Sequence, residues 1–187
     1  MVSKKKACIF ISGNGSNLLS LIKNTRDYNF PIKIELIISN NINAKGNILA
    51  KKFCIPFRFF SYKNKSIFER NCLKEIKKRK INFLCLAGFM KVLSNNFILN
   101  FGHKIINIHP SLLPKFKGLN THERVIKSKE KYSGCTVHFV TKKLDSGKII
   151  LQKKVLIRSN ETEVSLKNKI LEQEHKIYPR SIISLFK

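Results

Sequence analysis

Short apolar runs alternate with amphipathic stretches along almost the whole chain, and this alternation restricts the possible folds more than any other feature. Apolar runs that end at Gly, Pro, Asn or Ser are typical of buried strands, whereas apolar residues that recur every three or four positions indicate helices. Strands are predicted over residues 7–12, 33–39, 56–60, 82–87, 104–109, 135–141 and 148–157. Helices are predicted over residues 16–26, 44–53, 66–80 and 121–128, with a last one from Asn160. This order predicts a Rossmann-like α/β fold with a mainly parallel sheet and helices on both faces.

The last predicted helix carries two local signals. Asn160 is a suitable N-cap, and Glu163 three residues later completes a capping-box pattern. Pro179 lies inside the same helix, and we expect it to bend or interrupt the helix because proline has no backbone N–H.

Length and cysteine usage indicate one intracellular domain. The 187 residues show no internal repeat or long linker, so a single domain over residues 1–187 is expected. The N-terminal apolar stretch is too short for a signal peptide, and no run is long enough to span a bilayer. The five cysteines are scattered and contain no C-x-x-C pair, which argues against a disulfide framework and a zinc site. Free thiols in the cytoplasm are expected.

The formal net charge of +26 has two interpretations. It indicates either an anionic partner, such as nucleic acid or a membrane surface, or a genome-wide compositional bias towards Lys, Asn and Ile. The lysines are dispersed rather than gathered in one tail, which favours the bias. We therefore expect no nucleic-acid partner and no membrane, although the charge would help to attract anionic substrates.

A glycine-rich loop follows the first predicted strand. In parallel sheets ligands bind at the carboxyl ends of strands, which here are Ser12–Asn17, Gly88–Met90 and Asn107–His109. The glycines of Ser12–Asn17 allow close backbone approach, and free N–H groups at the start of the next helix favour an anion. The loop is neither a Walker A motif nor a complete G-x-G-x-x-G motif. Phosphate binding and an ordinary turn capped by Ser16 or Asn17 both remain open.

Asn107 and His109 form the second candidate. Residues two apart in a strand share a face, so the amide and the imidazole point the same way. An amide can stabilise an oxyanion while an imidazole donates or accepts a proton. A purely structural polar pair is the alternative, but Pro110 and Pro114 also predict a rigid turn beside it.

Two carboxylates complete the set of candidates. Asp145 follows a strand in which Thr136 and His138 share one face, and a pair with His109 would keep that imidazole protonatable near neutral pH. The alternative is a simple Asp-Ser-Gly turn. Glu174 shares a helical face with Ile170 and Ile177, so it is expected to point inward, either to a ligand or to a lysine.

Five segments in this order resemble the phosphoribosylglycinamide formyltransferases, which are folate-dependent enzymes of purine synthesis. They are Ile11–Leu18, Leu86–Met90, Asn107–Pro114, Val137–Val140 with Leu144–Gly147, and Gln173–His175 with Tyr178–Pro179. Asn-Ile-His-Pro-Ser-Leu-Leu-Pro is shared by formyl-folate enzymes generally, whereas Ser-Gly-Asn-Gly-Ser-Asn selects this family.

The resemblance implies a role for each matching residue. The catalytic residues would be Asn107, His109 and Asp145. Residues that bind the glycinamide ribonucleotide would be Gly15, Ser16, Asn17 and Glu174. Residues that bind folate would be Lys65, Met90, Lys91, Val92, Leu93, Asn107, Thr141, Lys142, Lys143, Leu144 and Asp145. The family transfers formyl from 10-formyltetrahydrofolate to N1-(5-phosphoribosyl)glycinamide without a metal. Its implied partners are small molecules, and the expected state is a monomer or homodimer.

The chain departs from the family pattern at three lysines and at its end. Lys65 stands where the family usually has an arginine. Lysine keeps the positive charge but cannot form the bidentate contact of an arginine. Lys142 and Lys143 replace residues that are often acidic, and the chain ends before the C-terminal extension of many relatives. Related alternatives are a formyltetrahydrofolate hydrolase, expected to have an extra N-terminal domain, and a methionyl-tRNA formylase, expected to have an extra C-terminal domain. A nucleic-acid-binding module is an alternative from another class.

Overall fold

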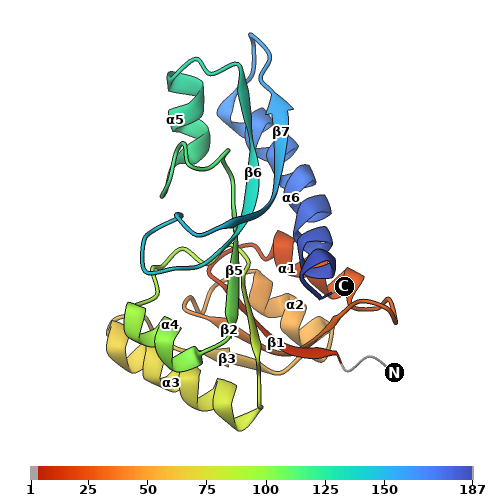
Figure 1. Cartoon of the computed structure of the whole chain (residues 1–187), viewed down its shortest axis with the longest axis vertical. Helices are drawn as coiled ribbons and strands as arrows, with labels where there is room; N and C mark the ends of the chain where they lie inside the picture. The colour runs from red at the N-terminus through yellow and green to blue at the C-terminus, as the bar shows by residue number, and fades with distance from the viewer. Residues whose placement is uncertain (1–3, 187) are drawn as a thin grey trace.

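A seven-stranded sheet forms the centre of the protein in a computed structural model that describes residues 4–186 (Figure 1). The strands lie in the order β3-β2-β1-β4-β5-β6-β7. Their bounds are β1 Lys5–Ile11, β2 Ile32–Ser39, β3 Phe57–Phe59, β4 Phe83–Leu86, β5 Lys104–His109, β6 Tyr132–Phe139 and β7 Ile149–Leu156. Strands β3, β2, β1, β4 and β5 pair in parallel, and β6 and β7 pair antiparallel. The predicted mainly parallel sheet is confirmed. Residues 1–3 and 187, which belong to the expected single domain, lie outside the described residues.

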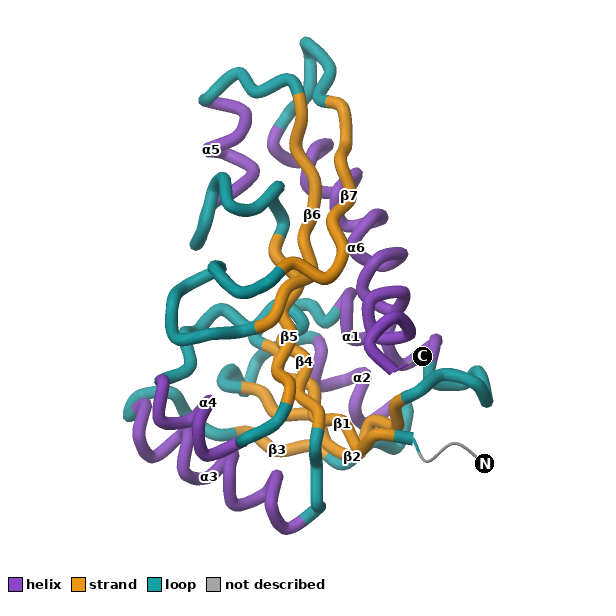
Figure 2. The backbone as a smooth tube through the Cα atoms, in the orientation of Figure 1, coloured by secondary structure: helices purple, strands orange, loops and turns teal. Residues whose placement is uncertain are grey.

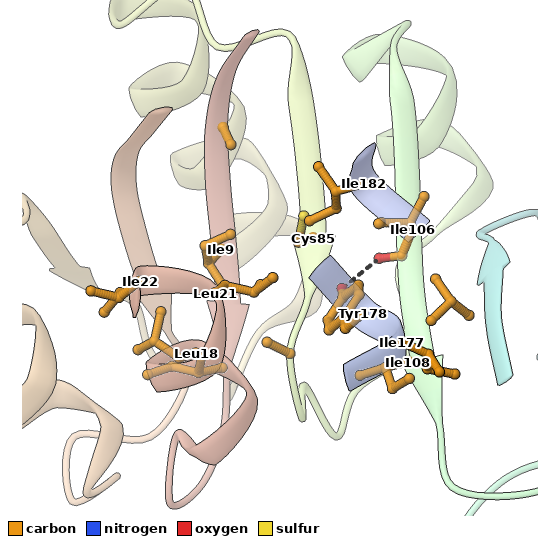
Figure 3. Packing of buried hydrophobic residues seen from close by; sticks show 14 of the residues in the cluster. Ile9, Leu18, Leu21, Ile22, Cys85, Ile106, Ile108, Ile177, Tyr178 and Ile182 are labelled. Carbon is orange, nitrogen blue, oxygen red and sulfur yellow. Dashed lines mark hydrogen bonds between the residues drawn. The ribbon is translucent and has the colours of Figure 1, made fainter. Parts of the chain in front are cut away.

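Helices cover both faces of the sheet, as predicted. Their bounds are α1 Ser16–Asn24, α2 Gly46–Lys52, α3 Lys65–Lys78, α4 Asn95–Phe101, α5 Thr121–Lys127 and α6 Glu163–Phe186. One buried cluster joins strand residues such as Ile9 and Ile106 to α1 and α6 (Figure 3). The other joins Phe10 to α3 and α4. Successive strand residues serve opposite clusters because side chains alternate across a strand.

Strands β6 and β7 form a hairpin that carries the sheet beyond the parallel part (Figure 2). Their pairing with β5 is antiparallel, so Asn107 lies opposite His138 and His109 lies opposite Thr136. Directly paired residues of an antiparallel ladder lie on the same face. The sheet therefore gathers four polar side chains from two segments that are distant in sequence.

Helix α6 differs from the prediction at its N-terminal box, and it is not interrupted at Pro179. Its N-terminal box is formed by Thr162 and Ser165: Ser165 N donates to Thr162 Oγ1 at 3.2 Å, and Thr162 N donates to Ser165 Oγ at 3.0 Å. The box predicted at Asn160 and Glu163 is therefore wrong by two residues. The helix also continues through Pro179. Pro179 has no N–H for the carbonyl of His175, which instead accepts a hydrogen bond from Ser20 Oγ at 2.9 Å.

Helix α4 is absent from the sequence-based assignment, although its ends carry clear signals. Ser94 caps it by accepting from Phe97 N at 3.0 Å, and Gly102 ends it with a φ of 67°. The buried pair Phe97 and Phe101 has helical spacing. The helix is short, so these signals extend over too few residues to form a periodic pattern.

Candidate active site

The carboxyl ends of β1 and β4 meet where the strand order reverses, the position at which open α/β sheets bind ligands. Ser12 joins the two ends through its backbone N, which donates to Gly88 O at 3.1 Å. Its hydroxyl donates to Asn40 Oδ1 at 2.6 Å and accepts from Met90 N at 2.8 Å. These contacts fix the glycine-rich loop and the start of the Met90–Leu93 segment relative to each other.

The glycine-rich loop leads directly into α1. Gly15 is the N-cap with a φ of 76°, and the helix has neither a side-chain cap bond nor an acidic residue in its first turn. A Cβ on Gly15 would lie 2.7 Å from Gly46 Cα, and Gly46 N donates to Gly13 O at 3.1 Å. The N–H groups that begin at Ser16 are thus available to an anion, and the loop that presents them is held by α2.

Asn17 and Glu174 meet beside this helix start. Asn17 Nδ2 donates to Glu174 Oε2 at 2.6 Å, and both residues are buried. Burial raises the pKa of Glu174 to about 7, and the bond from Asn17 opposes that increase. Asn17 Oδ1 is buried and has no hydrogen-bond partner among residues 4–186. The pair therefore combines a titratable carboxyl group with a free acceptor.

His109 ends β5 and is only 5% exposed. Its Nε2 lies 2.9 Å from Phe116 O, and its Nδ1 lies 3.4 Å from Asp145 Oδ2. A carbonyl and a carboxylate both accept, so only the doubly protonated ring can donate to both. The geometry thus suits an imidazolium ion at this position.

The ring of His138 is neutral, in contrast to that of His109. Its Nδ1 lies 2.9 Å from Phe139 O, which assigns the hydrogen to Nδ1 and leaves Nε2 as an acceptor. Asn107 Nδ2 donates to that Nε2 across 3.2 Å, and Asp145 Oδ1 lies 3.6 Å from it. Burial lowers the pKa of His138, which keeps the ring neutral. His138 thereby orients Asn107.

Asp145 is held by its backbone conformation and by a loop from another part of the chain. It has a φ of 45°, in the left-handed region that Asp tolerates better than most residues. Gly118 N donates to its Oδ2 at 2.9 Å. Its side chain is 8% exposed, so its charge is poorly screened beside His109.

Thr136 supports the turn that follows His109. Its hydroxyl donates to Ser111 O at 2.6 Å and accepts from Leu113 N at 3.2 Å. Gln152 Nε2 donates to the same oxygen at 2.8 Å. Thr136 is completely buried, so loss of this hydroxyl would leave several partners unsatisfied.

Met90–Leu93, predicted to line the folate pocket, connects β4 to α4. Tyr62 OH donates to Val92 O at 2.9 Å. The buried Glu69 on α3 accepts from Ser94 N at 2.7 Å and from Ser94 Oγ at 2.5 Å. Met90 and Val92 remain exposed on this restrained backbone, whereas Leu93 is buried.

Three of the four lysines in the predicted folate set form no hydrogen bond or ion pair with His109 or Asp145 among residues 4–186. Lys65 begins α3, and Lys142 and Lys143 are exposed in the Thr141–Leu144 loop before Asp145. Thr141 Oγ1 donates to Lys143 O at 3.2 Å, which stabilises the loop locally. None of the three lysines forms an ion pair among the residues that the structure describes.

Three groups in the cluster are missing from the predicted site. Phe116 and Gly118 contribute only backbone atoms, which a search for reactive side chains does not detect. His138 carries a sequence signal, because it shares a strand face with Thr136 two residues earlier. Within residues 4–186, no group of three or more His, Cys, Asp or Glu residues is placed to hold a metal ion. No described helix is long and apolar enough to cross a membrane.

Comparisons with known proteins agree with one another. The model of the formyl transferase family matches residues 5–182. The human trifunctional purine biosynthetic protein adenosine-3 is 41% identical over 184 residues, which cover 96% of this chain and 18% of that protein. The chain thus spans less than a fifth of that relative. Phosphoribosylglycinamide formyltransferase of Haemophilus influenzae is 39% identical, with 94% of this chain and 84% of that protein covered. The crystal structure of phosphoribosylglycinamide formyltransferase from Anaplasma phagocytophilum has a TM-score of 0.90 and 40% identity, and the match covers 95% of this chain and 84% of that one.

Proposed function

The chain belongs to the formyl transferase family, and from this premise we propose that it transfers a formyl group from 10-formyltetrahydrofolate to the amine of N1-(5-phosphoribosyl)glycinamide. This reaction belongs to de novo purine biosynthesis. A folate-type formyl donor follows from the family. The proposal also includes a cytoplasmic enzyme that acts as a monomer or homodimer.

The observation that carries the proposal is the position of His109 between the Phe116 carbonyl and the Asp145 carboxylate. The substrate amine attacks the formyl carbon, and the formyl oxygen becomes an oxyanion. We expect that oxyanion to replace the Phe116 carbonyl as the acceptor of the His109 Nε2–H. Asp145 stabilises the positive charge of the ring throughout. The positive charge of the His109 ring, held by the buried Asp145 carboxylate, favours the negatively charged oxyanion over the neutral formyl group.

Asn107 supplies a second donor. Its amide carries two hydrogens, of which one is directed to His138 Nε2 and the other is available to the oxyanion. The new C–N bond forms, the bond from the formyl carbon to the folate nitrogen N10 breaks, and the amine proton passes to that nitrogen. The site thus acts by positioning and by electrostatic stabilisation.

The two substrates would approach His109 from different elements. The start of α1, at Gly15–Asn17, would hold the phosphate of the ribonucleotide, and Glu174 would contact the same molecule. The folate would lie along Met90–Leu93, where the exposed Met90 and Val92 offer apolar contact to its ring. The Thr141–Asp145 loop would cover it.

The assay is formyl transfer from 10-formyltetrahydrofolate to the ribonucleotide, followed by mass spectrometry of the formylated product. His109→Ala is expected to reduce kcat by roughly 10²–10³-fold, because it removes the charged hydrogen-bond donor to the oxyanion. His103→Ala, which changes an exposed histidine outside the cluster, is the matched control and is expected to keep wild-type activity. Formate release without formylated product would instead identify a hydrolase. Salt-sensitive RNA binding without formyl transfer would favour the nucleic-acid module.

A further inference from the structure

A pocket at the amino-terminal edge of the sheet has no role in the mechanism above. Its volume is about 410 Å³, which is within the range of small-molecule sites. The C-terminal ends of α3 and α4, which lie on the same face of the sheet (Figure 1), form its walls together with the residues just before β4 and β5. His103 lines the pocket and His109 ends β5, so the pocket lies about 20 Å along the strand from the catalytic cluster.

Part of the pocket lining is apolar and aromatic. It includes Ile76, Ile81 and Phe101, which are otherwise buried in the core. The ring of His103 packs edge-to-face with that of Phe101, with 5.5 Å between the ring centroids and 82° between the ring planes. His103 itself is exposed, and nucleobases stack on histidine and phenylalanine rings in many proteins. This part of the lining therefore suits a flat heterocycle.

The same pocket carries uncompensated positive charge. Lys77, in the last turn of α3, and Lys80, just after that helix, both line it and are both exposed. Neither lysine forms an ion pair within residues 4–186. The described residues that line the pocket include no Asp or Glu. The ligand that this charge favours is an anion.

Two asparagine amides in the lining have unused acceptor oxygens. Asn82 Oδ1 is buried and has no hydrogen-bond partner among the described residues. Asn100 donates from its Nδ2 to Asn96 O and Oδ1, both at 2.8 Å, which leaves its own oxygen free. Buried polar groups are nearly always hydrogen-bonded, so an unpartnered one in a pocket wall indicates a donor that comes from outside. The terminal torsion of asparagine is broad, so rotation of the Asn82 amide can turn it towards a ligand.

We propose that this pocket binds an adenine mononucleotide, with its base on the apolar lining and its phosphate at Lys77 and Lys80. The Asn82 amide matches the edge of adenine, because its oxygen can accept from the exocyclic amine while its NH₂ group donates to N7. The two lysines provide charge-assisted hydrogen bonds to the phosphate. A bare inorganic anion would need only the lysines and would leave the amide and the apolar lining unused. The pocket shares no residue with the proposed site of formyl transfer, so this inference is independent of that function.

The test measures binding to the full chain by calorimetry, at low ionic strength because surface charges are screened by salt. The probes are adenosine monophosphate, inosine monophosphate, adenosine and inorganic phosphate. Inosine monophosphate has a 6-oxo group where adenosine monophosphate has the 6-amino group, so the pair isolates the contact to Asn82. The test variants are Lys77→Gln/Lys80→Gln and Asn82→Ala. The control is Lys51→Gln/Lys52→Gln on α2, which removes the same charge from exposed positions outside the pocket.

We expect the wild-type protein to bind adenosine monophosphate roughly 3- to 10-fold more tightly than inosine monophosphate, and more tightly than adenosine or phosphate. The lysine variant should weaken binding of adenosine monophosphate by roughly 3- to 10-fold, and the control should bind it as the wild type does. Asn82→Ala should remove the preference for the amino group.

Three results would overturn the inference. The first is no binding of adenosine monophosphate by the wild type. The second is equal binding of adenosine monophosphate and inorganic phosphate, which would show a simple anion site. The third is nucleotide binding that neither test variant changes, which would place the nucleotide elsewhere on the protein.

Discussion

Glu174 provides a quantitative test of the site, because its carboxyl group is buried and is bonded to one amide. Burial raises its pKa from 4.5 to about 7. Between these two values the native state binds more protons than the unfolded state, so the free energy of unfolding falls as pH rises. The shift corresponds to about 3 kcal/mol of stability, present below pH 4.5 and lost as pH passes about 7.

Glu174→Gln removes this titration and keeps an acceptor oxygen for Asn17 Nδ2. We expect the variant to gain stability relative to the wild type as pH rises from 4.5 to 8, by about 3 kcal/mol in total. In thermal unfolding this corresponds to a relative increase in Tm of about 6–12 °C across the range. Denaturant titrations at several pH values measure the free energy directly.

Glu172→Gln is the matched control, because it makes the same change at an exposed position of α6. Its stability profile should stay parallel to that of the wild type. If Glu174→Gln also stays parallel between pH 4.5 and 8, the carboxyl group does not titrate in this window and the reasoning from burial is wrong.

Three further predictions concern the rest of the site. Asp145→Asn is expected to reduce kcat by roughly 10²–10⁴-fold with little change in ribonucleotide affinity, as measured by steady-state kinetics and calorimetry. The control is Asp27→Asn, at the other aspartate of the chain. Wild-type turnover in Asp145→Asn would contradict the mechanism. Thr136→Val should lower the free energy of unfolding by about 2–4 kcal/mol, because three partners of its buried hydroxyl lose a bond, and a loss below about 0.5 kcal/mol would show that the turn reorganises. Gly15→Ala, whose Cβ would lie 2.7 Å from Gly46 Cα, should raise the KM for the ribonucleotide more than that for folate, and equal effects on both would argue against a phosphate site at this loop.

The sequence determined the elements of this fold and its chemically reactive residues. Apolar runs and helical spacing predict the seven strands and most helices, because these patterns reflect local periodicity that each segment carries in itself. The same local rule places Asn107 and His109 on one face of β5. Prediction from local sequence is wrong where the effect of a residue depends on hydrogen-bond partners in distant segments. Pro179 does not interrupt α6, because the hydroxyl of Ser20, in a distant segment, donates a hydrogen bond to the carbonyl of His175 that the proline leaves free.

Tertiary structure alone decided which of these residues meet. The antiparallel register of β5 and β6 brings His138 to Asn107, and the loop conformation of Asp145 brings its carboxylate to His109. Phe116 enters the site through a carbonyl oxygen that every residue possesses, so no pattern of side chains identifies it. Register, burial and loop conformation depend on packing between segments far apart in sequence. The sequence therefore specifies the reactive groups, whereas the folded chain specifies their distances and the burial that determines their charge.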